Sequence, residues 1–260
     1  MKLIDLHCHI LPGVDDGAQD MQMALTLAKA AVDEDISHIL VTPHHMDGVY
    51  LNHRQDVIEH TAAFQNELAM NQIPLVVFPG QEVHLTGQLP AAIEASDILF
   101  MDETDRYLLL ELPHSGVPEY TNKMLFDLIA QGITPVLAHP ERNAGFQKDP
   151  NKLYDLVKMG CLTQITASSY LGVFGSKVQQ LTEKIVKADQ GYIFASDAHN
   201  FEGRRFLMKE AFSKLANEEG QDKAKLFNEN AKNIINGDDV VRMNSQKITK
   251  VPKKKRFWLF

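Results

Sequence analysis

Two histidines two positions apart, His7 and His9, follow an apolar run at the start of the chain. Side chains two apart in a strand project from the same face, so this pair can direct two imidazoles at one spot. Imidazole nitrogen is a good ligand for a borderline divalent metal ion. The adjacent carboxylates Asp15 and Asp16 follow after a short Gly/Pro turn and add hard oxygen ligands. This arrangement is typical of the first strand of a metal-dependent hydrolase barrel.

Polar residues of the same kinds stand at or near the ends of other apolar runs. They occur in segments 42–45, 80–82, 110–112, 138–142 and 196–199. In a parallel barrel these strand ends converge on one face, where active sites lie. Each short motif is weak alone, since a buried carboxylate such as Glu111 can simply be half of an ion pair. Counting the first strand, such polar motifs stand at six of the seven proposed strand ends. Chance rarely produces all of them together.

The donor types limit the metal. The chain has only two cysteines, which argues against a structural zinc ribbon or an iron–sulfur cluster. Nitrogen and oxygen donors suit manganese, iron or zinc, and the order of intrinsic affinities does not decide among them.

The elements that must position these residues alternate along the chain. We predict seven strands over 3–6, 38–42, 75–78, 107–112, 134–138, 162–165 and 192–195. Their continuous hydrophobic character is typical of parallel strands covered on both faces. Helical periodicity covers 21–33, 54–70 and 227–235, and a further helix begins at 151, with Asp149 as N-cap, Pro150 in the first turn and Gly160 as the stop. Alternation of strands and helices predicts an α/β fold that forms a closed or nearly closed barrel.

Length, composition and net charge limit what type of protein this can be. The chain has 260 residues, of which 44% are hydrophobic, and a formal net charge of −8. These values fit one large domain and disfavour bulk binding to nucleic acid or to a membrane surface. The small number of cysteines fits a reducing cytosol. The N-terminus has no signal-peptide pattern. No apolar run approaches the roughly 20 residues that span a bilayer. We therefore expect a cytoplasmic protein.

We expect the barrel domain to comprise residues 1–245 and a basic and aromatic tail to comprise 246–260. Five basic residues lie within 250–256, and Phe257-Trp258-Leu259-Phe260 follow. One interpretation is a solvated chain end. The other is weak docking to an anionic surface, either the inner membrane leaflet or an acidic face of a partner kinase.

Five sequence blocks resemble a known family: HCH at 7–9, TPHH at 42–45, PGQE at 79–82, HPER at 139–142 and SDAHN at 196–200. They are similar to the polymerase and histidinol phosphatase (PHP) superfamily. More narrowly, they resemble the bacterial metal-dependent protein-tyrosine phosphatases of capsule and exopolysaccharide loci, the CpsB/YwqE type. The resemblance covers essentially the whole chain. It implies a distorted (β/α)7 TIM-like barrel with three divalent metal ions, usually manganese, at the C-terminal ends of the strands.

The resemblance also implies the role of each site residue. One metal would be held by His7, His9, Glu82 and Asp197; Glu82 would bridge to a second, held also by Glu111 and His139; Asp16, His44 and His199 would hold the third. Arg142 and Arg204 match the phosphate-binding arginines of the family. Many superfamily members have a histidine in place of Glu111, so this carboxylate favours the tyrosine-phosphatase branch.

The function implied is hydrolysis of phosphotyrosine on the tail of a bacterial tyrosine kinase, or on its substrates, by attack of metal-bound hydroxide, which would regulate capsule and exopolysaccharide synthesis. A cysteine-nucleophile phosphatase would need an arginine six positions after the cysteine. The residues there are Val14 after Cys8 and Ala167 after Cys161, so that route does not fit.

Other functions remain open. One is a small-molecule phosphatase of the histidinol-phosphatase type, or a phosphodiesterase. Another is a non-catalytic metal-binding PHP module, although the ligand set looks complete. A third is a metal-dependent amidohydrolase, but no predicted strand ends in the lysine that such enzymes carboxylate.

Several residues beside the proposed ligands receive a simpler interpretation. Strand alternation turns Cys8 away from His7 and His9, so we expect it to pack in the core. His45 is one residue out of phase with His44 and is expected to support the site or lie exposed rather than bind metal. His84 is left outside the site, and His114 lies either at the rim or in a solvated loop.

Overall fold

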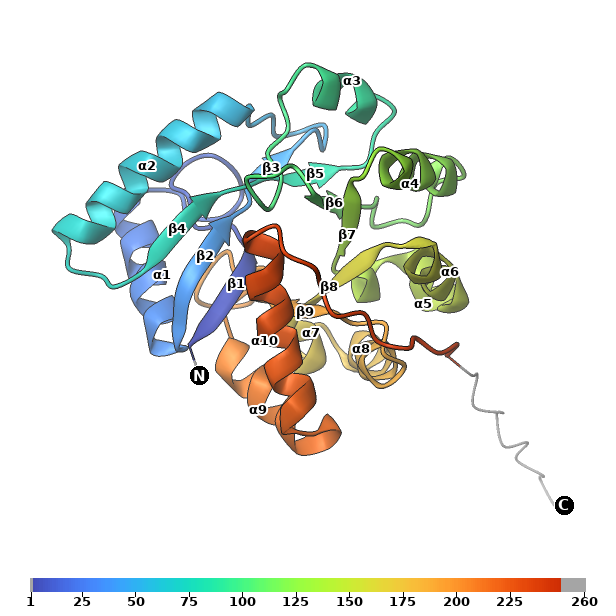
Figure 1. The fold of residues 1–260 in the computed structure, drawn as a ribbon. Helices are drawn as coiled ribbons and strands as arrows, with labels where there is room; N and C mark the ends of the chain where they lie inside the picture. The colour runs from blue at the N-terminus through green and yellow to red at the C-terminus, as the bar shows by residue number, and fades with distance from the viewer. Residues whose placement is uncertain (1, 249–260) are drawn as a thin grey trace, which may run out of the picture.

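Parallel strands and outer helices alternate along residues 2–248, the part of the chain that this computed structural model describes (Figure 1). The strands are β1 Leu3–Cys8, β2 Ile36–Val41, β3 His44–His45, β4 Val76–Pro79, β5 Glu82–His84, β6 Tyr107–Glu111, β7 Thr134–Ala138, β8 Leu162–Thr166 and β9 Ile193–Ala195. The helices are α1 Met21–Asp33, α2 Arg54–Met70, α3 Leu89–Glu94, α4 Thr121–Ala130, α5 Ala144–Lys148, α6 Asn151–Met159, α7 Ala167–Tyr170, α8 Ser176–Lys187, α9 Met208–Glu219 and α10 Gln221–Ile235, with a 3-10 turn η1 at Pro140–Arg142.

The strands form two parallel sheets, ordered β1-β2-β4 and β3-β5-β6-β7-β8-β9. Short breaks separate β2 from β3 and β4 from β5, at residues 42–43 and 80–81. Pro43 has no backbone N–H to donate to a sheet, which fits the first break. Each short strand therefore continues the preceding strand into the second sheet. The seven predicted strands are confirmed, and the sequence pattern missed only these two short continuations.

Contacts between β1 and the segment after β9 close the barrel. The Asp197 N–H donates to the His7 carbonyl at 2.8 Å, and the His9 N–H donates to the Ala198 carbonyl at 3.0 Å. Cys8 and Ala198 form a parallel bridge. The last strand position is thereby joined to the first, which confirms the expected distorted barrel of seven strand positions. The junction lies beside the predicted metal ligands.

A buried carboxylate holds this junction from inside the barrel. Asp5 is fully buried, and its carboxylate accepts hydrogen bonds from the Ser196 N–H at 2.9 Å and from the Ser196 hydroxyl at 2.5 Å. The Ser196 hydroxyl in turn accepts from the Ala198 N–H at 3.0 Å. Burial raises the pKa of Asp5 to about 6, against the lowering effect of the Ser196 hydrogen bonds. These bonds fix the segment that carries Asp197 and His199.

Replacing Asp5 with alanine is expected to destabilise the protein by about 3 kcal/mol, because it leaves the buried Ser196 donors unpaired. Equilibrium denaturation in urea measures this free energy of unfolding. Asp33→Ala, on an exposed position of α1, is the matched control and is expected to change it by less than about 0.5 kcal/mol. Equal effects of the two substitutions would contradict the role given to Asp5.

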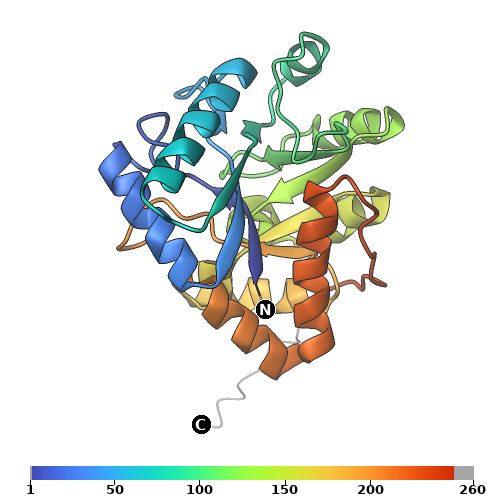
Figure 2. The same ribbon diagram turned by 60° about the vertical axis from the view of Figure 1, so that its left-hand side comes forward.

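Helices cover the outside of the strands and one end of the barrel. α9 and α10 lie at the end where β1 begins (Figures 1 and 2). There the Asn228 side chain accepts from the Ile4 N–H at 3.2 Å and donates to the Lys2 carbonyl at 3.0 Å. The opposite end, at the C-terminal ends of the strands, is left to loops. These loops carry the predicted site.

The predicted helices at 21–33 and 54–70 match α1 and α2. The predicted helix that begins at 151 is α6, and its start is confirmed, but the capping residue differs from the prediction by one position. Pro150 is the N-cap residue of α6 rather than part of its first turn, and Asp149 lies one residue further out, where its carboxylate accepts from the Asn151 N–H at 3.3 Å. A proline caps without loss because the first helical N–H groups have no partner within the helix. Gly160 ends the helix as predicted, with a φ of 131°.

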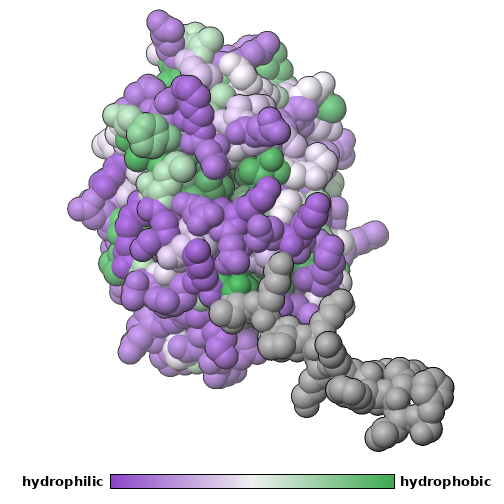
Figure 3. All heavy atoms as spheres, turned by 90° about the vertical axis from the view of Figure 1, so that its right-hand side faces the viewer, coloured by the Kyte–Doolittle hydropathy of each residue, from purple (hydrophilic) through white to green (hydrophobic). Residues whose placement is uncertain are grey.

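The side of the molecule that bears α4, α6 and α8 is mainly hydrophilic, with hydrophobic side chains gathered in separate patches (Figure 3). None of the helices within residues 2–248 is long and apolar enough to cross a membrane. The chain still packs on the barrel at Gln246, whose N–H donates to the Ala188 carbonyl at 2.9 Å. The predicted docking through the basic tail lies outside the described residues, and the boundary at 245/246 stays a prediction.

Candidate metal centre

The structure brings all nine predicted metal ligands together at one end of the barrel. Their donor atoms form overlapping groups in which every atom lies within 4.8 Å of the others. The groups are His9/Asp16/His44/His199, His7/Glu82/His139, His7/His9/Asp197, Glu111/His114/His139 and His44/Glu82/Glu111. His114 is the one member that the sequence did not place among the ligands.

His7 and His9 both face the barrel interior, as the two-residue period of β1 requires. Their Nε2 atoms lie 3.1 Å apart. Neighbours bind the other ring nitrogens: the Gln164 side-chain carbonyl lies 2.9 Å from His7 Nδ1, and an Asp15 carboxylate oxygen lies 2.7 Å from His9 Nδ1. Such partners orient a metal-binding imidazole and leave its second nitrogen free. Asp15 therefore orients His9, while Asp16 reaches the centre itself.

The loop after β1 must pass very close to His9 to deliver these carboxylates. A Cβ on Gly17 would lie 2.0 Å from the His9 carbonyl oxygen, so only glycine fits there. The Gly17 N–H donates to the Asp15 carboxylate at 2.9 Å, and the Ala18 N–H donates to the His9 carbonyl at 3.1 Å. This packing holds Asp15 and Asp16 against the strand end.

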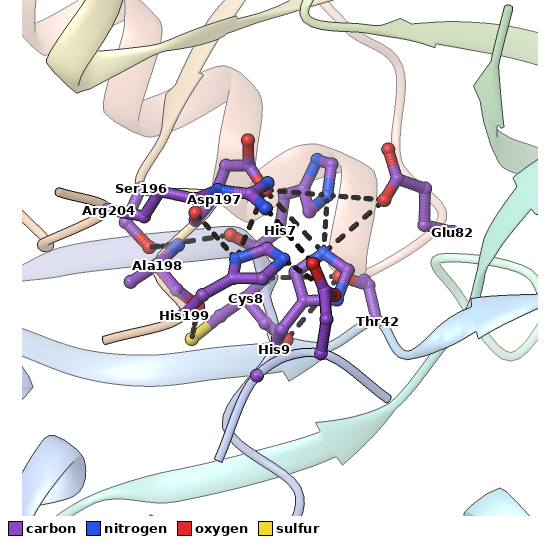
Figure 4. Close-up of polar contacts among 12 residues, drawn as sticks. His7, Cys8, His9, Thr42, Glu82, Ser196, Asp197, Ala198, His199 and Arg204 are labelled. Atoms are coloured by element: carbon purple, nitrogen blue, oxygen red, sulfur yellow. Dashed lines mark hydrogen bonds and ion pairs between the residues drawn. The ribbon is translucent and has the colours of Figure 1, made fainter. Parts of the chain in front are cut away.

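Glu82 faces four of the imidazoles, and Figure 4 shows its carboxylate pointing toward the histidine rings. Its Oε2 atom lies 3.2 Å from His7 Nε2, 3.3 Å from His9 Nε2 and 3.0 Å from His44 Nδ1. Its Oε1 atom lies 2.7 Å from His139 Nε2. Glu82 and these four histidines are buried or nearly buried. Among the described residues, Glu82 Oε2 has no well-formed hydrogen bond. A carboxylate surrounded by imidazoles on both oxygens suits a bridge between metal ions.

Two arginines, Arg142 and Arg204, converge on the carboxylate of Asp197, and Figure 4 draws the contact of Arg204. Arg204 donates to one carboxylate oxygen at 2.8 Å, and Arg142 donates to the other. Asp197 and His139, the residue three before Arg142, have left-handed backbone angles, with φ of 52° and 32°. Non-glycine residues in this region are uncommon and gather at functional sites.

The third predicted group lies nearest to solvent. His44 Nε2 and His199 Nε2 lie 3.4 Å and 3.2 Å from Asp16 Oδ1, and 46% of the Asp16 side chain is exposed. The cluster thus opens to solvent at Asp16, while His7, His9 and Glu82 lie at its buried end.

Glu111 lies between three histidines on the remaining side. His84 Nδ1 is 3.0 Å from one oxygen, and His114 Nε2 and His139 Nε2 are 3.6 Å and 3.8 Å from the other. His84, predicted to lie outside the site, contacts Glu111. Its position two residues after Glu82 on β5 was the available signal. His114 lies at the rim, with 68% of its side chain exposed.

The electrostatics of the cluster fit cations. Burial raises the pKa of Glu82, but His7 and the His139 hydrogen bond outweigh burial and hold this pKa well below its usual range. Burial likewise raises the pKa of Asp197, and Arg142 and Arg204 outweigh it. Burial lowers the pKa of His139 and of His199 to about 4, which leaves both rings neutral at pH 7. Ionised carboxylates beside neutral imidazoles are the donor set that divalent manganese, iron or zinc takes.

Two histidines are protonated before any metal binds. Burial lowers the pKa of His9, but Asp15 outweighs it and the value rises to about 9. Burial also opposes protonation of His44, whose hydrogen bonds with Asp16 and Glu82 raise the pKa to about 11. Metal binding must displace these protons, so the affinity of metal-free protein for Mn²⁺ is expected to rise about tenfold per pH unit for each proton displaced, up to about pH 9 for the His9 proton and up to about pH 11 for the His44 proton.

Calorimetric titration with Mn²⁺ in two buffers of different ionisation enthalpy measures the protons released. His53→Gln, at a half-exposed histidine paired with Asp97, is the control and is expected to leave the proton count unchanged. An affinity independent of pH between about 6 and 9 would contradict the proton displacement.

The remaining sequence expectations can be placed as well. Cys8 is buried, and its sulfur lies 3.8 Å from the Ala198 carbonyl, away from the imidazoles (Figure 4). His45 is buried behind the site, with its ring 6.0 Å from that of His53, and it joins none of the donor groups found among residues 2–248. Gln164 was not foreseen, because a glutamine within a strand carries no signal for a contact across the barrel.

The chain matches the family model described as capsular polysaccharide synthesis, CpsB/CapC, over residues 3–236. It is 37% identical to the tyrosine-protein phosphatase YwqE of Bacillus subtilis, over 99% of this chain and 100% of that protein. It is 36% identical to the putative tyrosine-protein phosphatase CapC of Staphylococcus aureus, over 81% and 82% of the two chains. A solved structure from work on YwqE and on CpsB from Streptococcus pneumoniae, described there as unique metal-dependent tyrosine phosphatases, superposes with a TM-score of 0.91 at 37% identity, over 95% of this chain and 100% of that one.

Proposed function

Because the chain belongs to the CpsB/CapC family of capsular polysaccharide synthesis, we propose that it is a metal-dependent tyrosine-protein phosphatase, a hydrolase of phosphate monoesters. The observation that carries this proposal is the joint placement of a buried His/Asp/Glu cluster and two arginines around Asp197. Such a centre combines sites for cations with donors for an anionic group. The relatives named tyrosine phosphatases support the choice of phosphotyrosine as substrate.

We propose three divalent ions, with manganese as the preferred one and iron or zinc as alternatives. The donor groups support His7, His9, Glu82 and Asp197 around one ion, with Glu82 shared with a second at Glu111 and His139. Asp16, His44 and His199 would hold the third, together with His9 as a neighbouring donor. When bound, such ions neutralise phosphoryl oxygens and lower the pKa of bound water toward about 7.

Arg142 and Arg204 are proposed to orient the phosphate group. Their terminal nitrogens reach Asp197, and their buried Nε atoms have no hydrogen-bond partner among the described residues. A guanidinium carries several donors in a fixed fork, so each arginine can donate to phosphate while it keeps its contact with Asp197. Part of each side chain is exposed, 14% for Arg142 and 25% for Arg204, so an incoming substrate can reach them.

The cysteines have no place in the proposed chemistry. Burial raises the pKa of Cys8 well above its usual range and raises that of Cys161 to about 12. A thiol rather than a nucleophilic thiolate is therefore present at pH 7 at both positions. Tyrosinate, whose parent pKa is about 10, is a tolerable leaving group without an acid to protonate it.

We propose that the physiological substrate is the phosphotyrosine-bearing tail of a bacterial tyrosine kinase in the cytoplasm, and that dephosphorylation regulates capsule and exopolysaccharide synthesis. The description of the family as one of capsular polysaccharide synthesis supports the regulatory role, and relatives named tyrosine-protein phosphatases support a phosphotyrosine-bearing substrate. The half-exposed side chain of Asp16 marks the side from which a substrate would reach the cluster.

The test is phosphate release from a tyrosine-phosphorylated kinase-tail peptide by metal-stripped protein, with and without added Mn²⁺. Histidinol phosphate at equal concentration is the comparison substrate. We expect release to require Mn²⁺ and to favour the peptide. Release from histidinol phosphate alone would keep the metal centre but refute the tyrosine-phosphatase assignment, and release from neither would favour a binding module.

A further inference from the structure

An aromatic side chain outside the metal cluster packs on one of the two site arginines. Phe174 lies in the loop between α7 and α8, and the guanidinium carbon of Arg142 is 5.2 Å from the centre of its ring. Arg142 in turn reaches Asp197 at the centre. Phe174 therefore stands next to the place proposed for the phosphate group, one contact away from it.

The loop that carries Phe174 has a defined shape. Gly172 and Gly175 both have left-handed φ, of 86° and 89°, and the Gly175 N–H donates to the Gly172 carbonyl at 3.0 Å. The Val173 N–H donates to the Ser168 carbonyl at 3.0 Å, which ties the turn to α7. The turn holds Phe174 in place before any substrate arrives, so little ordering is needed on binding.

Phe174 is not a core residue. It is half-buried, and its neighbour Val173 is 45% exposed. The aromatic residues of the core, such as Tyr107, Tyr170 and Phe194, are by contrast almost fully buried. The partly exposed Phe174 therefore leaves apolar surface beside a charged centre, where an apolar group can pack.

The chemistry of the proposed substrate supplies such a group. In phosphotyrosine the ester oxygen joins the phosphorus directly to a phenyl ring. When Arg142 binds the phosphate group, this ring therefore lies next to the Arg142 side chain. On the side of the α7–α8 loop, the Arg142 side chain is in contact with Phe174. Aromatic rings attract each other in offset or edge-to-face pairs, and an alkyl phosphate ester has no ring bonded directly to its ester oxygen to make this contact.

We propose that Phe174 is a specificity-determining residue that binds the phenyl ring of the substrate. The inference rests on the proposed function, since it identifies what makes the site prefer an aromatic phosphate ester. It predicts that Phe174 contributes to binding of the aromatic group and leaves the affinity for phosphate itself unchanged.

The experiment compares two ligands by calorimetry on the manganese-loaded protein. One is phosphonomethyl-phenylalanine, a phosphotyrosine analogue that cannot be hydrolysed, and the other is inorganic phosphate. Phe174→Leu, which keeps an apolar side chain but removes the ring, is expected to weaken the analogue about tenfold and to leave inorganic phosphate unchanged. Phe174→Trp is expected to retain the affinity for the analogue. Phe126→Leu, at a 60% exposed ring on α4, is the matched control and is expected to change neither.

Two results would overturn the inference. Equal weakening of both ligands by Phe174→Leu would mean that Phe174 only positions Arg142, and unchanged affinity for both would mean that the ring is not used. Because the analogue is not hydrolysed, these results do not depend on turnover. Absence of phosphotyrosine hydrolysis by the wild-type protein, with the analogue still bound through Phe174, would refute the proposed function and not this inference.

Discussion

Replacement of Glu82 by glutamine is expected to lower phosphotyrosine hydrolysis by at least about 10³-fold, which corresponds to about 4 kcal/mol of transition-state stabilisation. Glu82 is the carboxylate whose two oxygens face the imidazoles of His7, His9, His44 and His139 within 3.3 Å. Glutamine has nearly the same shape as glutamate, but it removes the negative charge. It also places an amide N–H among the imidazoles that are proposed to bind the metal ions. The loss follows because a neutral amide cannot bridge two cations.

The measurement is kcat/KM on the phosphotyrosine peptide at saturating Mn²⁺, with the metal content of the purified variant as a second readout. Glu94→Gln, at an exposed position on α3, makes the same chemical change away from the centre and should leave both values near wild type. A Glu82→Gln variant that retained its full metal content and most of its activity would rule out the bridging role. The fold is expected to survive, because Glu82 packs among polar side chains and its replacement changes no volume.

The second large effect is expected at Arg142. Replacement by alanine should lower kcat/KM by about 10²-fold, because it removes a preorganised donor from the position where charge develops on the phosphoryl oxygens. Arg142 also shares Asp197 with Arg204, so its loss leaves that buried carboxylate with one guanidinium in place of two. Arg142→Lys is expected to recover little of the activity, since an ammonium ion cannot reproduce the fork of donors.

Steady-state kinetics with the phosphotyrosine peptide measure this loss, and the Ki of inorganic phosphate reports the binding of the anion separately. Arg205→Ala, at an exposed arginine beside Arg204, is the control for a simple change of net charge. If Arg205→Ala and Arg142→Ala lowered activity equally, general electrostatic attraction would explain the effect in place of a specific contact. A full recovery of activity in Arg142→Lys would also contradict the contact proposed here.

Local sequence patterns predicted most of the framework. The seven hydrophobic runs are the strands of the barrel, and the helices at 21–33 and 54–70 have the predicted bounds. These patterns succeed because a buried parallel strand needs apolar residues on both faces, and an amphipathic helix repeats its apolar residues with the helical period. The two-residue period also separated His7 and His9 from Cys8 correctly, since it depends only on the pleat of one strand.

Contacts across the barrel were beyond the reach of these patterns. Nothing local marks Gln164 as the partner of His7, or Asp5 as the hydrogen-bond acceptor for Ser196. The strands that carry these pairs are far apart in sequence, and each side chain alone is an ordinary polar residue. The short strands β3 and β5 were missed for a different reason, because two or three residues are too few to show a period.

The sequence by itself thus determined the order of strands and helices, the residue types at the strand ends and, through its resemblance to a family, the set of candidate ligands. Only the tertiary structure decided how these residues meet: that Glu82 faces four of the imidazoles, that both arginines converge on Asp197, and that Phe174 borders Arg142. The physical reason is that periodicity reports which face of an element is buried. Distances between side chains depend instead on barrel closure and on loop shape, which arise from contacts across the whole chain.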